Sequence, residues 1–169
     1  MTRRSVIAAA RRSAVMPRGG AFARLEVHDL AAPVIRALLR DADLAPDRVD
    51  ELILSNALGG GGNPARVAAL AAGLPLRVAG LSIDRQCCGG LDAIVQGDAL
   101  IRAGLADIVI AGGAESYSRR PLRLRTDPDG GEARAYDRPP LPLARPRPRD
   151  GSGRRGADPA HGDLARGSG

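Results

Sequence analysis

The chain has 169 residues, 44% of them hydrophobic, which is enough for one domain with a buried core. Its net charge of +6 is unevenly placed: residues 1–118 hold 13 Arg against 12 acids, and residues 119–169 hold 12 Arg against 7. The basic character therefore belongs to the C-terminal part, every cation is Arg, and nucleic acid is not expected as a partner.

The location of the protein and the state of its thiols follow from two further features. No apolar run reaches the roughly 18 residues that a membrane span needs, and residues 1–12 lack the apolar core of a signal peptide. We therefore expect a cytoplasmic protein.

Cys87 and Cys88 are the only cysteines, and because they are adjacent they cannot join distant segments, so both are expected to be reduced.

The first predicted elements are a strand and a helix separated by a loop. Residues 5–10 predict a short buried strand, and residues 11–23 are rich in Gly, Pro and Arg without periodicity. Residues 28–42 predict a helix, with Pro33 tolerated near its start. Its buried stripe is expected to consist of large apolar residues at helical spacing: Leu30, Val34, Ile35, Leu38 and Leu39.

A second strand and helix follow. Residues 49–54 form an apolar run typical of a buried strand, and four glycines at 59–62 make a loop. Asn63 then supplies an N-cap and Pro64 a first-turn proline for a helix that extends to Ala72 and ends at Gly73.

Two more strands flank a third helix. Residues 78–83 and 107–111 predict strands, and residues 89–102 predict a helix closed by Gly104. The buried face of this helix is expected to include its larger apolar residues: Leu91, Ile94, Val95, Ala99 and Ile101. Apolar strands that alternate with helices indicate an α/β fold with a mixed, mostly parallel sheet and helices on both faces.

The alternation of predicted strands and helices ends after residue 118. Residues 119–139 predict the start of a loop region with turn chemistry at 127–131. Residues 140–169 consist mostly of Arg, Pro, Gly, Asp and Ala, and such a segment cannot offset its ordering entropy by burial. We expect a disordered tail there, and translation in a shifted reading frame would explain its composition.

Cys87 is the candidate nucleophile. It falls just beyond the third predicted strand and before a helix, and ligands of parallel sheets bind at the carboxyl ends of strands. Partial positive charge at a helix N-terminus favours the reactive thiolate, and backbone N–H groups there can hold an oxyanion. Gly89 and Gly90 leave room for a substrate, while Arg85 either adds positive potential or pairs with Asp84. The alternative is a cysteine that merely packs as a small hydrophobe.

Three motifs in order extend this argument. Residues 84–91, Asp-Arg-Gln-Cys-Cys-Gly-Gly-Leu, resemble the nucleophile motif of thiolases, in which Asn-Arg or Asn-Lys and one further residue precede the reactive cysteine. Residues 63–66, Asn-Pro-Ala-Arg, and residues 111–118, Ala-Gly-Gly-Ala-Glu-Ser-Tyr-Ser, resemble further thiolase segments. With the opening strand and loop, the resemblance covers residues 5–118 and identifies the chain as similar to the N-terminal half of a thiolase.

The resemblance implies an acyl-CoA C-acyltransferase of fatty acid metabolism. Cys87 would carry an acyl group from acetyl-CoA or another acyl-CoA as a thioester, in a Claisen condensation or in thiolysis of a 3-ketoacyl-CoA. No cofactor or metal is expected, and the full-length family forms homodimers or homotetramers. The activating His, a second Cys and an oxyanion hole belong to the C-terminal half of the family. His28 is expected at a helix start and His161 in the tail, so the chain should be nearly inactive alone.

The sequence differs from the usual thiolase nucleophile motif at three positions, and other functions compete with the acyltransferase. Asp84 replaces Asn, and Cys88 and Gly89 replace the usual Gly, Ser or Ala followed by Ser, which indicates a divergent branch. Cys88 is expected to pack at the helix start, with a redox role for the cysteine pair as the alternative. A ketoacyl-synthase-like enzyme is disfavoured by residues 63–66 and 112–118. A non-catalytic dimerisation module and a nucleic-acid-binding tail are the competing functions.

Overall fold

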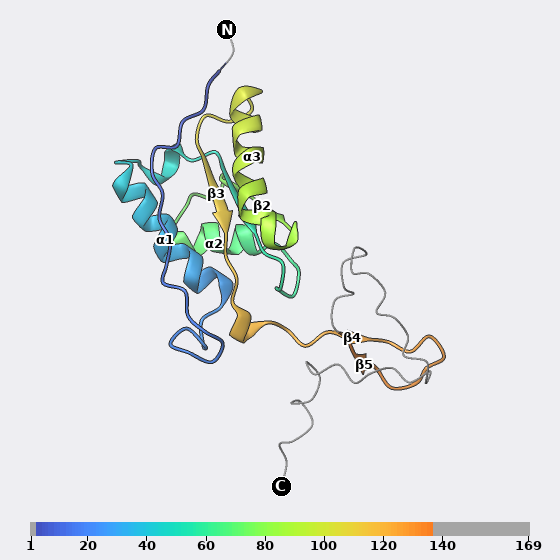
Figure 1. Ribbon diagram of the computed structural model, residues 1–169. Helices are drawn as coiled ribbons and strands as arrows, with labels where there is room; N and C mark the ends of the chain where they lie inside the picture. The colour runs from blue at the N-terminus through green and yellow to red at the C-terminus, as the bar shows by residue number, and fades with distance from the viewer. Residues whose placement is uncertain (1–2, 137–169) are drawn as a thin grey trace, which may run out of the picture. The chain divides into compact units, whose positions relative to one another are not determined.

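A computed structural model describes residues 3–136, and the chain divides into two units, Met1–Leu122 and Arg123–Gly169. The first is an α/β unit with helices on both faces of a parallel sheet, as predicted. Its elements, shown in Figure 1, are α1 Val27–Asp41, η1 Pro46–Arg48, β1 Glu51–Ser55, α2 Pro64–Ala72, β2 Ala79–Ile83, η2 Gln86–Cys88, α3 Gly89–Arg102, β3 Val109–Gly113 and η3 Tyr117–Arg119.

The described sheet of this unit has the strand order β2-β1-β3, and both pairings are parallel. Parallel neighbours need crossover connections, which α2 and α3 supply. Ser55 at the end of β1 is level with Ile83 of β2 and Gly113 of β3. The three carboxyl ends therefore lie at one edge of the sheet, and the loops that leave them meet there.

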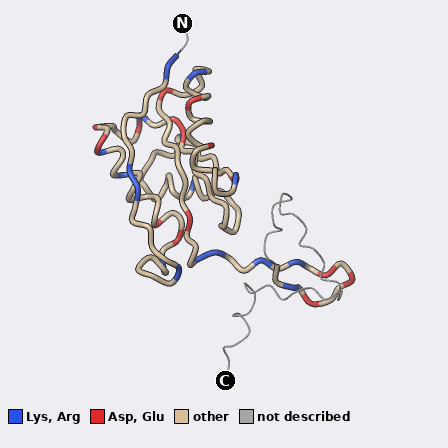
Figure 2. The backbone as a smooth tube through the Cα atoms, in the orientation of Figure 1, with Lys and Arg blue, Asp and Glu red and all other residues tan. Residues whose placement is uncertain are grey.

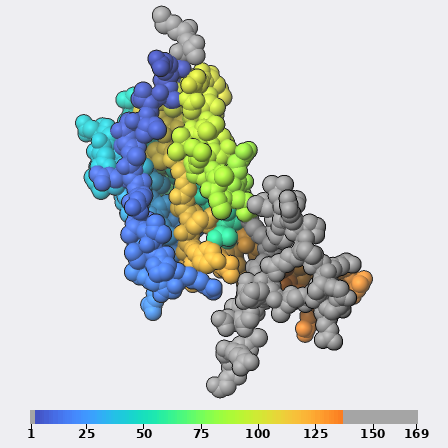
Figure 3. Space-filling view, viewed as in Figure 1, coloured from blue at the N-terminus to red at the C-terminus, as the bar shows by residue number. Residues whose placement is uncertain are grey.

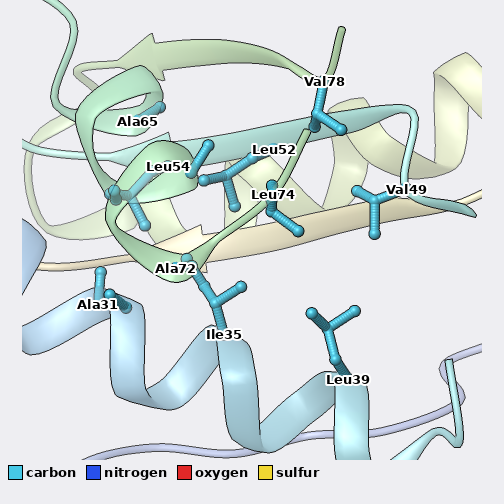
Figure 4. Close-up of a cluster of buried hydrophobic side chains, with 13 residues drawn as sticks. Ala31, Ile35, Leu39, Val49, Leu52, Leu54, Ala65, Ala72, Leu74 and Val78 are labelled. Carbon is cyan, nitrogen blue, oxygen red and sulfur yellow. The ribbon is translucent and has the colours of Figure 1, made fainter. Parts of the chain in front are cut away.

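One face of the sheet is covered by α1 and α2 (Figure 4). Leu52 and Leu54 of β1 point into this core, which Ile35 and Leu39 close from α1. The helix α2 contributes only alanines, so it can approach the sheet and α1 closely. The predicted stripe of α1 is right in part: Ile35 and Leu39 are buried. Leu30, Val34 and Leu38 are only partly buried and line a hollow at the surface.

The opposite face is covered by α3, and here the predicted buried side of the helix is wrong. The helix contacts the sheet through Gly89, Ala93 and Gly97, which recur every fourth residue. A Cβ on Gly97 would lie 3.2 Å from Val109 Cγ1, which is tighter than ordinary van der Waals contact, so the helix lies close to β3 at this glycine. Leu91 and Val95, by contrast, are 68% and 57% exposed.

The short helix α2 is fixed at both ends as the sequence predicts. The Asn63 side chain accepts a hydrogen bond from the N–H of Arg66, and Pro64 opens the first turn. Gly73 ends the helix in the left-handed region at φ 85°. The Arg66 guanidinium then donates to the carbonyls of Leu76 and Val78 and holds the chain that leads into β2.

The N-terminal segment differs from its prediction. Residues 5–10 are extended but belong to no strand, and Val6 and Ile7 are 84% and 79% exposed. Side chains fasten the segment instead: Ser5 bonds Asp98 of α3, and Arg11 bonds Asp41 of α1. Figure 3 shows it as a dark blue ridge. A hollow of about 330 Å³ is lined by residues 11–17, α1 and β3.

The described part of the second unit is a small antiparallel pair, β4 Leu124–Arg125 and β5 Arg134–Ala135. Only a loop is predicted here from the sequence, and its turn at 127–131 is confirmed. Asp127 organises that turn, because its carboxylate accepts from the N–H of Asp129 and its carbonyl from the N–H of Gly130. The predicted disordered tail, residues 140–169, lies outside the described residues.

Charges of both signs alternate over the first unit (Figure 2), in keeping with its nearly balanced composition. Several acids of the helices pair with Arg, among them Asp98 with Arg102 at 2.9 Å. Among residues 3–136, no helix is both long enough and apolar enough to cross a membrane.

Candidate active site

Cys87 lies in the connection between β2 and α3, at the edge where the strands end. Strand β2 ends at Ile83, the 3₁₀ turn η2 spans Gln86–Cys88, and α3 begins at Gly89. The structure therefore places Cys87 beyond the third predicted strand and directly before a helix, as expected from the sequence. Its thiol is free and exposed, so a large substrate can reach it from solvent.

The turn that presents Cys87 has an unusual backbone. Gln86 has φ 51°, a left-handed conformation that residues with a Cβ rarely adopt. The Asp84 side chain supports it by accepting a hydrogen bond of 3.0 Å from the Gln86 N–H. Asp84 thus has a structural role that an Asn side-chain oxygen could equally fill, which explains why Asp is tolerated where Asn is usual.

Two N–H groups beside the thiol are already used within the turn. The Cys88 N–H donates to the Arg85 carbonyl at 3.2 Å, and the Gly89 N–H donates to the Gln86 carbonyl. Neither donor is available to an oxyanion in this conformation. The predicted oxyanion-holding role therefore cannot fall to these two groups without a rearrangement of η2.

The two glycines after the cysteines differ in their surroundings. Gly89 is buried, and a Cβ there would lie 2.7 Å from Ser55 Cβ and closer still to Ser55 Oγ. A Cβ on Gly90 would meet only the Gly113 nitrogen, at 3.9 Å. Gly89 therefore lets α3 dock on the end of β1, a role the sequence alone did not reveal. Contact of Gly89 or Gly90 with a substrate stays a prediction.

A carboxylate ties the neighbouring loops together at the same edge. Glu115, just after β3, accepts hydrogen bonds from the N–H groups of Ala57 and Leu58 in the loop after β1. Asn56 donates to the Ala114 carbonyl at 2.9 Å and to Glu115 at 3.2 Å. These bonds join the ends of β1 and β3.

Another network holds β2, the strand that leads to Cys87. The Asn63 amide donates to the Gly80 carbonyl at 2.7 Å, and Ser82 Oγ donates to Asn63 Oδ1 at 2.7 Å. The Ala65 N–H in turn donates to Ser82 Oγ at 2.9 Å. The Asn-Pro-Ala-Arg segment therefore fixes the start of α2 against β2. Ser82 was missed by sequence reasoning because a lone serine in a strand carries no local signal.

The charges near Cys87 are arranged along α3. Arg85 Nε lies 3.4 Å from Asp92 Oδ2 in the first turn of the helix, and Gln96 donates to the same carboxylate at 2.9 Å. Arg85 is thus paired with Asp92. Cys88 occupies the N-cap of α3 as expected, but it is exposed, so its predicted packing role is wrong.

His28 lies in the first turn of α1, where the sequence analysis placed it. Its Nε2 is 3.6 Å from Asp29 Oδ1, and its side chain is 39% exposed. It lines a hollow of about 260 Å³ with residues 59–62 and Arg119, whose walls do not include Cys87. His161 falls outside the described residues. Between residues 3 and 136, no group of three or more His, Cys, Asp or Glu could hold a metal ion.

Comparison with known proteins identifies the family. Residues 5–137 match the family model described as thiolase, N-terminal domain. The chain belongs to the thiolase family. An acetyl-CoA acetyltransferase of Cupriavidus necator is 42% identical over 137 residues, which make up 78% of this thiolase chain and 35% of the relative. A Bacillus subtilis protein, provisionally named an acetyl-CoA C-acetyltransferase, is 46% identical over 140 residues, 78% of this chain and 38% of its own.

A solved structure shows the same relationship. The crystal structure of the Bacillus anthracis acetyl-CoA acetyltransferase superposes with a TM-score of 0.74 at 37% identity. The match covers 79% of this thiolase chain and 36% of the other. The resemblance inferred from three motifs is thus confirmed, and the chain spans less than two fifths of the length of these relatives.

Proposed function

We propose that the chain is the nucleophile-bearing part of a thiolase-type acyl-CoA C-acyltransferase in which Cys87 carries the acyl group. The observation that supports this most is the exposed Cys87 thiol, held on a strained turn at the carboxyl edge of a parallel sheet in a thiolase N-terminal domain. The relatives named as acetyl-CoA acetyltransferases make acetyl-CoA the first substrate to test.

In the first half-reaction, Cys87 is the only residue that forms a covalent bond with the substrate. The Cys87 thiolate attacks the thioester carbonyl of acetyl-CoA, the bond to the coenzyme A sulfur breaks, and coenzyme A leaves as the thiol after taking a proton. A second thioester, deprotonated next to its carbonyl, then attacks the acyl-Cys87 to form a 3-ketoacyl-CoA, and thiolysis is the reverse. Coenzyme A thioesters act as substrates here, and no further cofactor takes part.

The second half-reaction needs a base, and His28, the histidine among residues 3–136, lines a hollow whose walls do not include Cys87. His28 is beside Asp29 at the start of α1, and the N–H groups of Cys88 and Gly89 are engaged in the turn. Loss of a general base alone costs about 10²–10⁴ in rate. We therefore expect the isolated chain to take an acyl group slowly and to show little condensing or thiolytic turnover.

Mass spectrometry of the acylated chain tests this proposal. Cleavage after Arg85 and Arg102 releases residues 86–102, which contain both cysteines. After incubation with acetyl-CoA, this peptide should gain one acetyl group in the wild type and in Cys88→Ser, and none in Cys87→Ser. Acetylation that persists in Cys87→Ser, or ordinary enzyme turnover of acetoacetyl-CoA with coenzyme A by the isolated chain, would contradict the proposal.

A non-catalytic module that pairs with a second copy of the chain is the alternative, with the homodimer as its assembly. The exposed apolar side of α3 favours it, because Leu91 and Val95 are 68% and 57% exposed, and Leu105, shortly after the helix, is 75% exposed. Iodoacetamide distinguishes the two functions. Rapid alkylation of Cys87 relative to a model thiol supports the acyltransferase, whereas an unreactive thiol in a chain that sediments as a dimer supports the module.

A further inference from the structure

The residue after the candidate nucleophile is a second exposed thiol. Cys87 and Cys88 are both free and exposed, and they are the last two residues of η2. Cys88 is the N-cap of α3, but its side chain makes no capping hydrogen bond. Both sulfur atoms are therefore open to reagents in solvent, and neither is committed to a structural contact.

Acyl transfer through Cys87 does not need this second thiol. The thiolase motif usually carries Gly, Ser or Ala at the following position, and the Cys88 side chain, on a backbone with helical φ −91° and ψ −2°, makes no capping hydrogen bond for α3. The start of α3 therefore does not depend on a thiol at this position. The property that it adds is redox chemistry with its neighbour.

The turn that carries the two thiols can change shape without disturbing the core. Local hydrogen bonds hold it, from the Cys88 N–H to the Arg85 carbonyl, from the Gln86 N–H to the Asp84 side chain and from the Gly89 N–H to the Gln86 carbonyl. The next residue, Gly89, is buried against Ser55 and anchors α3. Any adjustment needed to bring the two sulfur atoms together therefore falls on residues 84–88.

We propose that Cys87 and Cys88 form an oxidation site for hydroperoxides, in which Cys88 resolves the oxidised nucleophile. The Cys87 thiolate attacks one peroxide oxygen, the O–O bond breaks, and water or an alcohol leaves, so Cys87 becomes a sulfenic acid. The Cys88 thiolate then attacks the Cys87 sulfur and expels hydroxide, which leaves as water after taking a proton. Two thiols are oxidised by two electrons, one peroxide is reduced, and a disulfide joins neighbouring residues.

Such a bond is strained and exposed, so a dithiol reductant should reverse it readily. While it lasts, Cys87 cannot take an acyl group, but it is also protected from further oxidation to sulfinic acid, which thiols do not reverse. This site goes beyond the proposed acyl transfer, since its chemistry needs neither coenzyme A nor a catalytic base.

Peptide mass spectrometry tests the proposal on the full chain. The chain is treated with hydrogen peroxide, free thiols are blocked, and residues 86–102 are released by cleavage after Arg85 and Arg102. In the wild type this peptide should lose the mass of two hydrogen atoms and regain it with dithiothreitol. Cys88→Ser, which keeps an N-cap residue, should instead accumulate sulfinic acid at Cys87 that dithiothreitol does not remove.

Two outcomes would overturn the proposal. One is accumulation of sulfinic acid at Cys87 at the same rate in the wild type and in Cys88→Ser. The other is a disulfide found between two chains, visible as a dimer on a non-reducing gel, in place of the bond within one peptide. Acetylation of Cys87 by acetyl-CoA is measured separately in reduced protein, so failure of one proposal leaves the other standing.

Discussion

Substitution of Gly89 by Ala tests how closely the start of α3, next to the candidate nucleophile, packs against Ser55 at the end of β1. The added Cβ would lie 2.7 Å from Ser55 Cβ, whereas carbon atoms in contact are about 3.5–4.0 Å apart. The Ser55 hydroxyl can rotate away, but its Cβ is fixed to the backbone, so α3 or the end of β1 must move by about 1 Å. Overpacking of this kind costs about 1–3 kcal/mol, and the helix propensity gained by Ala offsets at most about 1 kcal/mol.

Gly90→Ala is the matched control, because it makes the same chemical change one residue later where the nearest atom is 3.9 Å away. Urea unfolding followed by circular dichroism should show a lower midpoint for Gly89→Ala and an unchanged or higher one for Gly90→Ala. Ser55→Gly in the Gly89→Ala background should recover about 1–2 kcal/mol, since it removes the blocking atoms. Equal midpoints for the two alanine variants would refute this account of the packing.

Three further predictions concern stability, each measured by urea unfolding. Burial raises the pKa of Glu51, whose Oε1 has no hydrogen-bond partner. Its ionisation therefore destabilises the fold as pH rises through the ordinary pKa of a Glu carboxyl. Because the side chain is only partly buried and water screens its charge, Glu51→Gln should add at most about 1 kcal/mol at neutral pH and nothing well below the ordinary pKa. Hydrogen bonds from the N–H groups of Ile108 and Asp107 lower the pKa of Asp50. The stability that the Asp50 carboxylate contributes is therefore present above the ordinary pKa of Asp and is lost as pH falls through the lower pKa of the folded state. Asp50→Ala should cost about 1–2 kcal/mol at neutral pH and little in acid. Asn63→Ala should cost about 1 kcal/mol through the lost cap of α2, and Asn63→Asp should cost less because it keeps an acceptor, although not the bond to Gly80.

Local chemistry explains what the sequence predicted well. The helix over residues 89–102 and the cap, first-turn proline and terminal glycine of α2 depend on neighbours within a few residues, and the structure has all of them. The position of Cys87 at the start of α3 follows for the same reason. Its strained turn was not predictable, because the positive φ of Gln86 depends on a hydrogen bond to Asp84 that no propensity encodes.

Long-range packing explains the misses. Hydrophobicity alone selected the wrong side of α3, because the docking side is defined by close approach, and Gly89, Ala93 and Gly97 have little apolar surface to signal it. Residues 5–10 have the composition of a strand, yet a strand requires a hydrogen-bonding neighbour, and side-chain contacts hold the segment instead. The antiparallel pair of residues 124–135 is short and exposed, so no hydrophobic alternation marks it.

The wrongly predicted buried side of α3 lies on the helix that begins at the candidate site. The apolar residues expected in the core are those that the described unit leaves open: Leu91 is 68% exposed one turn after Cys87, and Val95 is 57% exposed one turn later. Both follow the nucleophile along the helix that presents it. The chain spans under two fifths of the length of the relatives it matches. Cys87 is itself free and exposed, so acylation of its thiol is the first reaction to measure under the proposed function.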